Sequence, residues 1–148
     1  MNIDVVTEDD LADLLPLMRG YCDFYKVTPT DDELMALARA LIAAPDHDGI
    51  QLMARDDEGR ALGFATLYWT WSTLSASRTS IMNDLFVHSD ARGTGLAEAL
   101  IEESRRRSGQ HGATSMGWET AKDNFRAQKV YERIGGKREE WISYSLDT

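Results

Sequence analysis

The sequence of 148 residues is poor in the side chains that hold disulfides and metals, with one cysteine and three histidines. Cys22 alone cannot form an intramolecular disulfide, and no Cys and His residues have the spacing of a metal site. We therefore expect a protein of a reducing compartment that folds without either device, and we predict no metal-binding residues. Cys22 lies on an apolar helical stripe and is interpreted as a packing residue.

Long apolar runs and an excess of basic residues are missing as well. Nowhere do about eighteen apolar residues follow one another, and the first ten residues have no basic segment before an apolar one. We therefore expect a cytoplasmic protein without a membrane partner. Sixteen Lys and Arg against 25 Asp and Glu give a net charge of −9. Nucleic-acid binding needs a basic face, so we expect no nucleic-acid partner. The charge would suit a small cationic substrate, although acidity can also serve solubility alone.

The apolar pattern that is present predicts an α/β domain spanning residues 1–148. A capping box, Thr30 to Glu33, marks the start of the second helix. In chain order we predict a strand at 3–6, helices at 11–25 and 30–44, strands at 49–56, 61–71 and 78–87, a helix from 96, a strand at 113–120, a helix at 124–134 and a strand at 137–146.

A glycine-containing loop, Arg92-Gly93-Thr94-Gly95, joins a predicted strand to the helix that starts at Leu96. The first N–H groups of a helix have no partner inside it, and the helix dipole places partial positive charge there. Glycines would let these groups face a phosphate, and Arg92 adds a fixed positive charge. The spacing fits neither a P-loop nor a dinucleotide fingerprint. A plain structural turn remains the alternative for this loop alone.

A second motif lies on the helix predicted at 124–134. Asn124 and Tyr131 are seven residues apart, so they share a helix face at about 10 Å along its axis. One extended ligand could touch both. Alternatively, Asn124 is a helix cap and Tyr131 a core residue.

Together the two segments resemble the GNAT superfamily of N-acetyltransferases. Arg92-Gly93-Thr94-Gly95-Leu96-Ala97 is similar to its Gln/Arg-x-x-Gly-x-Gly/Ala signature, and Asn124-x-x-Ala127-x-x-x-Tyr131-x-x-x-Gly135 is similar to its downstream helix. The resemblance implies the GNAT fold, a mixed sheet of about six to seven strands flanked by four helices, with a splay between the fourth and fifth strands. It also implies an acyltransferase that moves an acetyl group directly from acetyl-CoA to a primary amine.

The resemblance assigns roles to particular residues. The pyrophosphate of acetyl-CoA would lie on the N–H groups of Gly93, Thr94, Gly95, Leu96 and Ala97, beside Arg92. The pantetheine would run along Leu85, Phe86 and Val87, whose strand edge offers backbone groups to its amides, and Asn124 and Ala127 would also contact the cofactor. Tyr131 is the candidate general acid for the leaving thiolate, and the backbone N–H near Leu85 or Phe86 would polarise the thioester carbonyl. Asp84, ahead of Glu119, is the candidate base for the amine, directly or through water.

The acceptor is expected to be a small cationic amine, because the chain resembles the spermidine/spermine (diamine) branch of the family around Asn83-Asp84 and at 136–141. That branch has Glu where this chain has Asn83, so one substrate-binding carboxylate is missing. We predict acceptor contacts from Tyr21, Tyr25, Asn83, Asp84 and Glu119. Trp69 and Trp71 could add aromatic faces for a cation, or serve packing. Alternatives are a protein lysine or N-terminal acetyltransferase and a non-catalytic acyl-CoA-binding domain. A homodimer, through the last strand at 141–146, follows from the resemblance.

Overall fold

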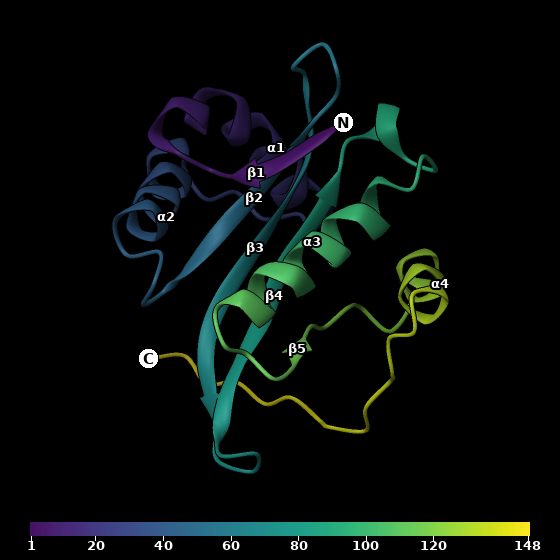
Figure 1. The fold of residues 1–148 in the computed structure, drawn as a ribbon. Helices are drawn as coiled ribbons and strands as arrows, with labels where there is room; N and C mark the ends of the chain where they lie inside the picture. The colour runs from purple at the N-terminus through teal and green to yellow at the C-terminus, as the bar shows by residue number, and fades with distance from the viewer.

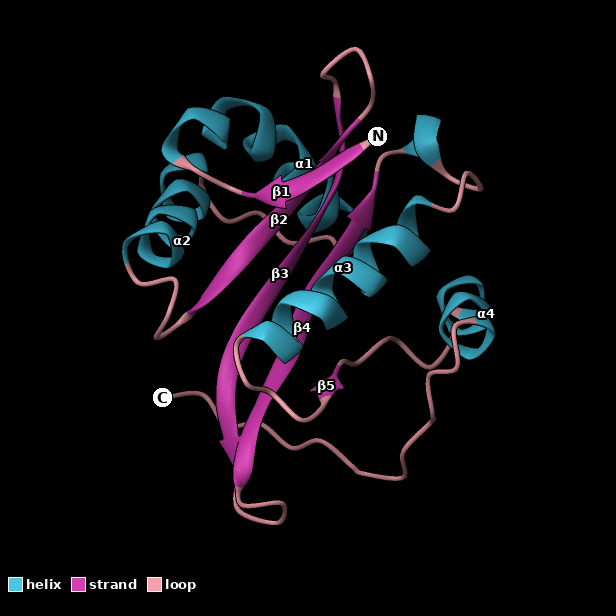
Figure 2. Ribbon diagram, viewed as in Figure 1, coloured by secondary structure: helices cyan, strands magenta, loops and turns pink.

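The computed structural model describes residues 1–148 and has the predicted α/β architecture (Figures 1 and 2). A five-stranded sheet has the order β1-β2-β3-β4-β5. Neighbouring strands are antiparallel from β1 to β4, whereas β5 is parallel to β4. The elements are β1 (Asn2–Val5), α1 (Leu11–Phe24), α2 (Asp31–Ala43), β2 (Gly49–Arg55), β3 (Ala61–Ser72), β4 (Ser77–Val87), α3 (Leu96–Gln110), β5 (Met116–Gly117) and α4 (Phe125–Arg133), with short 3-10 turns η1 (Glu8–Asp10) and η2 (Ser89–Ala91).

The sheet separates two hydrophobic cores. Successive side chains of a strand point to opposite faces, so Phe64 packs against the side of α1 and α2 while Ala65 packs against the side of α3. Figure 2 shows α3 crossing the face of β3 and β4, with α1 and α2 on the other side of the sheet. The Thr30 capping box forms as predicted: Glu33 N–H donates to Thr30 Oγ1 at 3.2 Å, and Thr30 N–H donates to the Glu33 carboxylate at 2.7 Å.

A β-bulge in β4 decides which of its side chains face α1. Thr66 pairs with Asp84 and the next residue, Leu67, pairs with Met82, so Asn83 is the extra, unpaired residue. A bulge of this kind shifts the inward and outward alternation by one residue. Met82 and Leu85 therefore both pack on the α3 side, although they are three residues apart. Asp84 is turned to the α1 side.

The predicted splay between the fourth and fifth strands is present. β5 pairs with β4 only at Ser80↔Met116 and Ile81↔Gly117. From Met82 to Val87 the edge of β4 has no neighbouring strand on that side, and in Figure 1 the chain after β5 leads away from β4 toward α4. The longer strand predicted at 113–120 is thus reduced to two residues.

The strand predicted at 137–146 does not form, so the sheet has five strands and not the six to seven expected. A strand needs a neighbouring backbone to pair with, and the backbone of residues 137–148 makes no hydrogen bond. The segment touches the end of β5 through Ser143 Oγ, which donates to Glu119 Oε1 at 2.7 Å. Its large side chains are 77–93% exposed: Trp141, Ile142, Tyr144 and Leu146.

Candidate active site

The loop between β4 and α3 presents free backbone N–H groups to solvent. Gly93 and Gly95 have φ of +77° and +87°, a left-handed conformation that favours glycine. The N–H groups of residues 93–97 donate to no group of the protein. An added Cβ at either glycine would meet nothing within 4 Å, so these glycines do not serve close packing. The loop fits an anion such as a pyrophosphate, as the predicted role of residues 92–97 requires.

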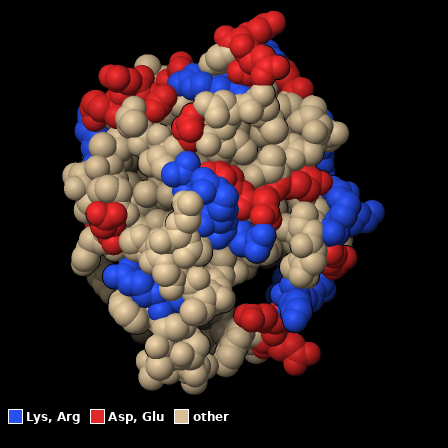
Figure 3. All heavy atoms as spheres, viewed as in Figure 1, with Lys and Arg blue, Asp and Glu red and all other residues tan.

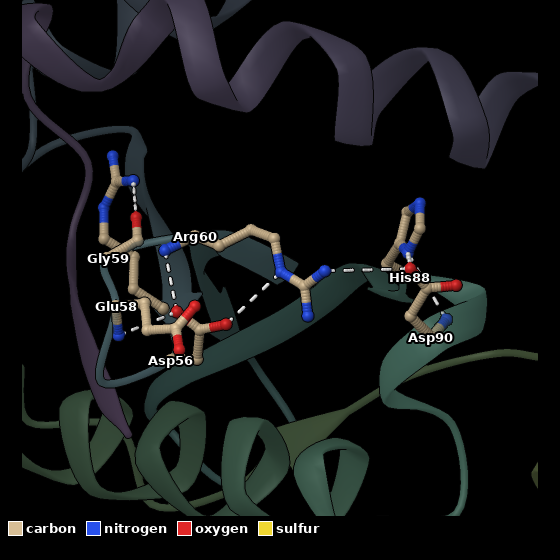
Figure 4. A network of polar contacts seen from close by, with 7 residues as sticks. Asp56, Glu58, Gly59, Arg60, His88 and Asp90 are labelled. Atoms are coloured by element: carbon tan, nitrogen blue, oxygen red, sulfur yellow. Dashed lines mark hydrogen bonds and ion pairs between the residues drawn. The ribbon is translucent and has the colours of Figure 1, made fainter.

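Polar contacts hold this loop against the rest of the sheet. Thr94 Oγ1 donates to Ala91 O at 2.7 Å, and Arg92 Nε donates to Val87 O at 3.3 Å. On the other side, Asp90 N–H donates to His88 Nδ1, and Arg60 lies 3.8 Å from the Asp90 carboxylate (Figure 4). These contacts link the loop to the β2–β3 turn and would keep its N–H groups in place.

The free edge of β4 runs from the bulge to this loop. His88 N–H donates to Leu62 O at 2.8 Å, and antiparallel pairs alternate between bonded and non-bonded residues. Leu85 and Val87 therefore turn their N–H and C=O groups away from β3, toward the open edge. Phe86 turns its side chain to the α1 side, where it packs with Phe64 at 6.2 Å between ring centroids. Of the two N–H groups predicted to face the thioester carbonyl, that of Phe86 points to β3 and that of Leu85 points to the open edge.

Tyr131 projects from α4 beyond this edge. Asn124 caps the helix, since Ala127 N–H donates to its Oδ1 at 3.2 Å, and the helix ends where Gly136 N–H donates to Tyr131 O at 2.8 Å. The Tyr131 ring is half-buried and lies edge-on to Trp118, with 5.4 Å between centroids. Burial raises the pKa of the Tyr131 hydroxyl, and the neighbouring Tyr25 raises it further, while a hydrogen bond with Thr120 acts in the opposite direction. The phenol therefore holds its proton at neutral pH.

A group of tyrosines surrounds Asp84 on the α1 side of the sheet. Tyr21 donates to the carbonyl of Asn83 at 3.4 Å and contacts Tyr25, with 5.0 Å between ring centroids. Burial raises the pKa of Tyr21 and of Tyr68, and in both cases the nearby Asp84 carboxylate adds to the rise. The structure thus brings together four of the five predicted acceptor residues, Tyr21, Tyr25, Asn83 and Asp84.

Sequence reasoning missed Tyr68, although a signal was present. Strand alternation places it on the opposite face of β3 from Trp69, and on the same face as Thr66, the partner of Asp84. Trp69 instead packs on the α3 side, where it stacks on His111 at 4.1 Å and donates to Pro45 O at 2.7 Å. Of the two roles considered for Trp69, the structure therefore shows packing, and Trp69 does not line the acceptor cluster.

Other predicted or notable groups lie outside this cluster. Trp71 is 68% exposed and lies under Arg78. Glu119 is exposed and accepts a hydrogen bond from Ser143 in the C-terminal segment. Two cavities, of about 170 and 380 Å³, lie between α2 and β1–β2 and between α1 and the start of β3. Neither is lined by Tyr131 or Asp84. The Asp84–tyrosine cluster is instead a partly exposed site beside the free edge of β4.

The charged groups of α3 neutralise one another. Arg105 pairs with Glu102, and both Arg106 and Arg107 pair with Glu103 at 2.6–2.7 Å. Blue and red atoms accordingly alternate on the face shown in Figure 3, without a continuous basic area. No helix is long and apolar enough to cross a bilayer, and no three His, Cys, Asp or Glu side chains are grouped as metal ligands would be.

Comparison with known proteins defines the class to which this fold and site belong. The profile of the Acetyltransferase (GNAT) family matches residues 14–136. An uncharacterized N-acetyltransferase of Bacillus subtilis, YhfO, is 31% identical over 148 residues, covering 99% of this chain and 97% of that protein. The chain therefore belongs to the GNAT family and is an acetyltransferase.

Two further proteins that resemble this chain have a named substrate or a bound ligand. The D-amino-acid N-acetyltransferase HPA3 of Saccharomyces cerevisiae is 33% identical over 89 residues, which is 60% of this chain and 55% of that protein. The aminoglycoside N-acetyltransferase AAC(6')-Iy, solved in complex with CoA, shares the fold with a TM-score of 0.86 at 23% identity, covering 99% of this chain and 93% of that chain. Family and fold together support acetyl-CoA as the acetyl donor. The spermidine/spermine branch is not confirmed.

Proposed function

We propose that this protein transfers an acetyl group from acetyl-CoA directly to the primary amine of a small cationic acceptor. The observation that carries the proposal is that the free edge of β4 runs from the Asp84–tyrosine cluster to the loop of unpaired N–H groups. The candidate amine site thus lies near one end of this edge, and the candidate pyrophosphate loop follows its other end. Donor and acceptor sites would meet at the bulge.

The proposed reaction assigns one step to each group. Asp84 takes a proton from the bound ammonium, directly or through water. The free amine attacks the thioester carbonyl carbon, whose oxygen accepts a hydrogen bond from Leu85 N–H. The carbon–sulfur bond then breaks, and the departing sulfur takes the proton of the Tyr131 hydroxyl. The nitrogen loses its second proton, which returns through water to the Tyr131 phenolate, and Asp84 releases its proton to solvent. The products are the acetylated amine and CoA, and no covalent enzyme intermediate is needed, so Cys22 remains a packing residue.

Tyr131→Phe tests the acid. We expect turnover to fall at least tenfold while the dissociation constant of acetyl-CoA stays within a factor of two, because only the proton donor is lost. Release of CoA thiol across a panel of amines measures turnover, and calorimetry measures binding. Tyr144→Phe, an exposed tyrosine of the C-terminal segment, is the matched control. Undiminished turnover in Tyr131→Phe would remove this residue from the mechanism.

The yeast relative suggests a second candidate acceptor, a D-amino acid. A D-amino acid has an ammonium group, as the small cationic amine does, but it also carries a carboxylate beside that group. A diamine or polyamine would instead present a second cation. The two candidate acceptors differ in the charge next to the amino group, so they can be distinguished by what surrounds Asp84.

We further propose a cytoplasmic homodimer. The buried free thiol of Cys22 is compatible with a reducing compartment. The C-terminal segment supports self-association, since Trp141 and Tyr144 are 78% and 91% exposed and its backbone is unpaired. Light scattering of the full chain should give twice the monomer mass, and deletion of residues 139–148 should give the monomer mass. A monomer of the full chain at about 100 μM would contradict the dimer.

A further inference from the structure

We infer that Asp84, with Tyr21, Tyr25 and Tyr68 around it, forms an ammonium site that selects amines without a carboxylate next to the amino group. This inference rests on the proposed function and narrows its acceptor to alkylamines and arylalkylamines, at the expense of amino acids. It also assigns Tyr68 as a specificity-determining residue.

The bulge at Asn83 creates the site. In a strand without the bulge, residues two apart face the same side, so Asp84 would face α3 as Met82 does. With it, Asp84 shares the α1 side with Tyr68 from β3 and with Tyr21 and Tyr25 from the last turns of α1. The walls thus come from three elements, and aromatic rings together with one carboxylate make a favourable surface for an ammonium group.

Tyr68 is held where its hydroxyl can act on the bound cation. Its neighbour in sequence, Trp69, is fixed on the opposite face by Pro45 and His111, so Tyr68 cannot turn to the α3 side without breaking those contacts. The Tyr68 hydroxyl is not engaged in any hydrogen bond within the protein, whereas Tyr21 uses its hydroxyl on Asn83 O. Tyr68 therefore has a free hydroxyl oxygen on the side of Asp84, and that oxygen can accept from an ammonium group.

The charges near the site explain the selection against a carboxylate. Asp84 is the charged group that the fold places within the cluster, since the other members are the phenols of Tyr21, Tyr25 and Tyr68. Two cations lie near this end of α1: Arg19 is bound to Pro29 O and to Asp31, and Lys26, which follows Tyr25, is exposed to solvent, where its charge is screened. A substrate carboxylate would therefore lie near Asp84, and the cluster itself holds no positive partner for it. Juxtaposed like charges are strongly unfavourable in a partly dry site.

The test uses acceptors that differ only by the carboxylate: phenethylamine, D-phenylalanine and L-phenylalanine. With the full chain and acetyl-CoA, we expect kcat/KM for phenethylamine to exceed that for either amino acid at least tenfold. Asp84→Asn should lower kcat/KM for phenethylamine. It should also reduce the ratio of kcat/KM for phenethylamine to kcat/KM for the amino acids, because the neutral amide no longer repels their carboxylate. A purely structural effect would lower all three values together. Asp147→Asn, in the exposed C-terminal segment, is the control.

Tyr68→Phe separates the role of the hydroxyl from that of the ring. We expect KM for phenethylamine to rise threefold to tenfold with KM for acetyl-CoA unchanged, since only one ammonium contact is lost. Equal or better use of either phenylalanine isomer, or an unchanged ratio in Asp84→Asn, would overturn the inference and leave the amine acetyltransferase standing. Absence of thiol release with every amine would instead overturn the proposed function itself.

Discussion

Alanine at Gly93 or Gly95 should weaken acetyl-CoA binding by much more than it weakens the fold. Both glycines have φ near +80°, and an alanine there costs about 1 kcal/mol because its Cβ crowds the backbone in the left-handed region. No steric cost adds to this, since the new Cβ meets nothing within 4 Å. For a chain of this length such a loss lowers the melting temperature by about 2–4 °C.

The effect on the ligand has a different origin. The new methyl group would stand in front of N–H groups that have no partner in the protein and that we assign to the pyrophosphate. Loss of one hydrogen bond to a charged oxygen is worth about 1.5–3 kcal/mol, which corresponds to a rise of roughly tenfold to a hundredfold in the dissociation constant.

Gly112→Ala provides the matched control. Gly112 has φ of +90°, and its added Cβ also meets nothing within 4 Å, but it follows the C-terminal end of α3. Circular dichroism should show a similar loss of stability in all three variants, whereas calorimetry should show weaker acetyl-CoA binding only for Gly93→Ala and Gly95→Ala. If acetyl-CoA binds to all three equally well, the loop is a structural turn and the assignment of the pyrophosphate site is wrong.

Two further predictions concern the elements behind the site. Asn124→Ala removes the cap of α4, so it should lower the unfolding free energy by about 1 kcal/mol and lower kcat because Tyr131 is less well positioned. Asn124→Asp should keep the stability and kcat of the original protein. An unchanged kcat in Asn124→Ala would show that the cap does not position Tyr131. The Arg106 guanidinium, with Arg107, lowers the pKa of Glu103 to about 2. Because this folded-state pKa lies below the unfolded one, the stabilisation is present above about pH 4.5 and is lost as the pH falls toward 2. In urea titrations, Glu103→Gln should therefore lower the free energy of unfolding by about 1 kcal/mol at pH 7 and leave it unchanged near pH 2. A loss of stability that persists at pH 2 would contradict the ion-pair explanation.

Local sequence patterns were sufficient for the elements whose signals are carried within a few residues. The Thr30 capping box formed as predicted because its two hydrogen bonds join residues three apart. The loop at 92–95 likewise carries its own signal, since glycines permit positive φ and the following helix leaves its first N–H groups free. The order of strands and helices up to α4 followed from apolar periodicity alone.

Pairing between distant segments could not be predicted in the same way. The alternation at 137–146 is typical of a strand, yet those residues have no backbone partner in this structure. The face of Asp84 depends on the bulge at Asn83, which is defined only by the register between β3 and β4. The spacing of Met82 and Leu85, three residues apart and both apolar, was the one hint of it in the sequence.

The sequence by itself indicated the class of protein, the glycine loop before α3 and the place of Tyr131 on α4, because each depends on the chemistry of a short segment. Only the tertiary structure decided which side chains meet. It brought Tyr25 against Tyr21, added Tyr68 to the cluster around Asp84 and placed Trp69 on the opposite face. The physical reason is that a single extra residue in one strand reverses the facing of every side chain beyond it, and such a shift leaves almost no trace in composition or local pattern.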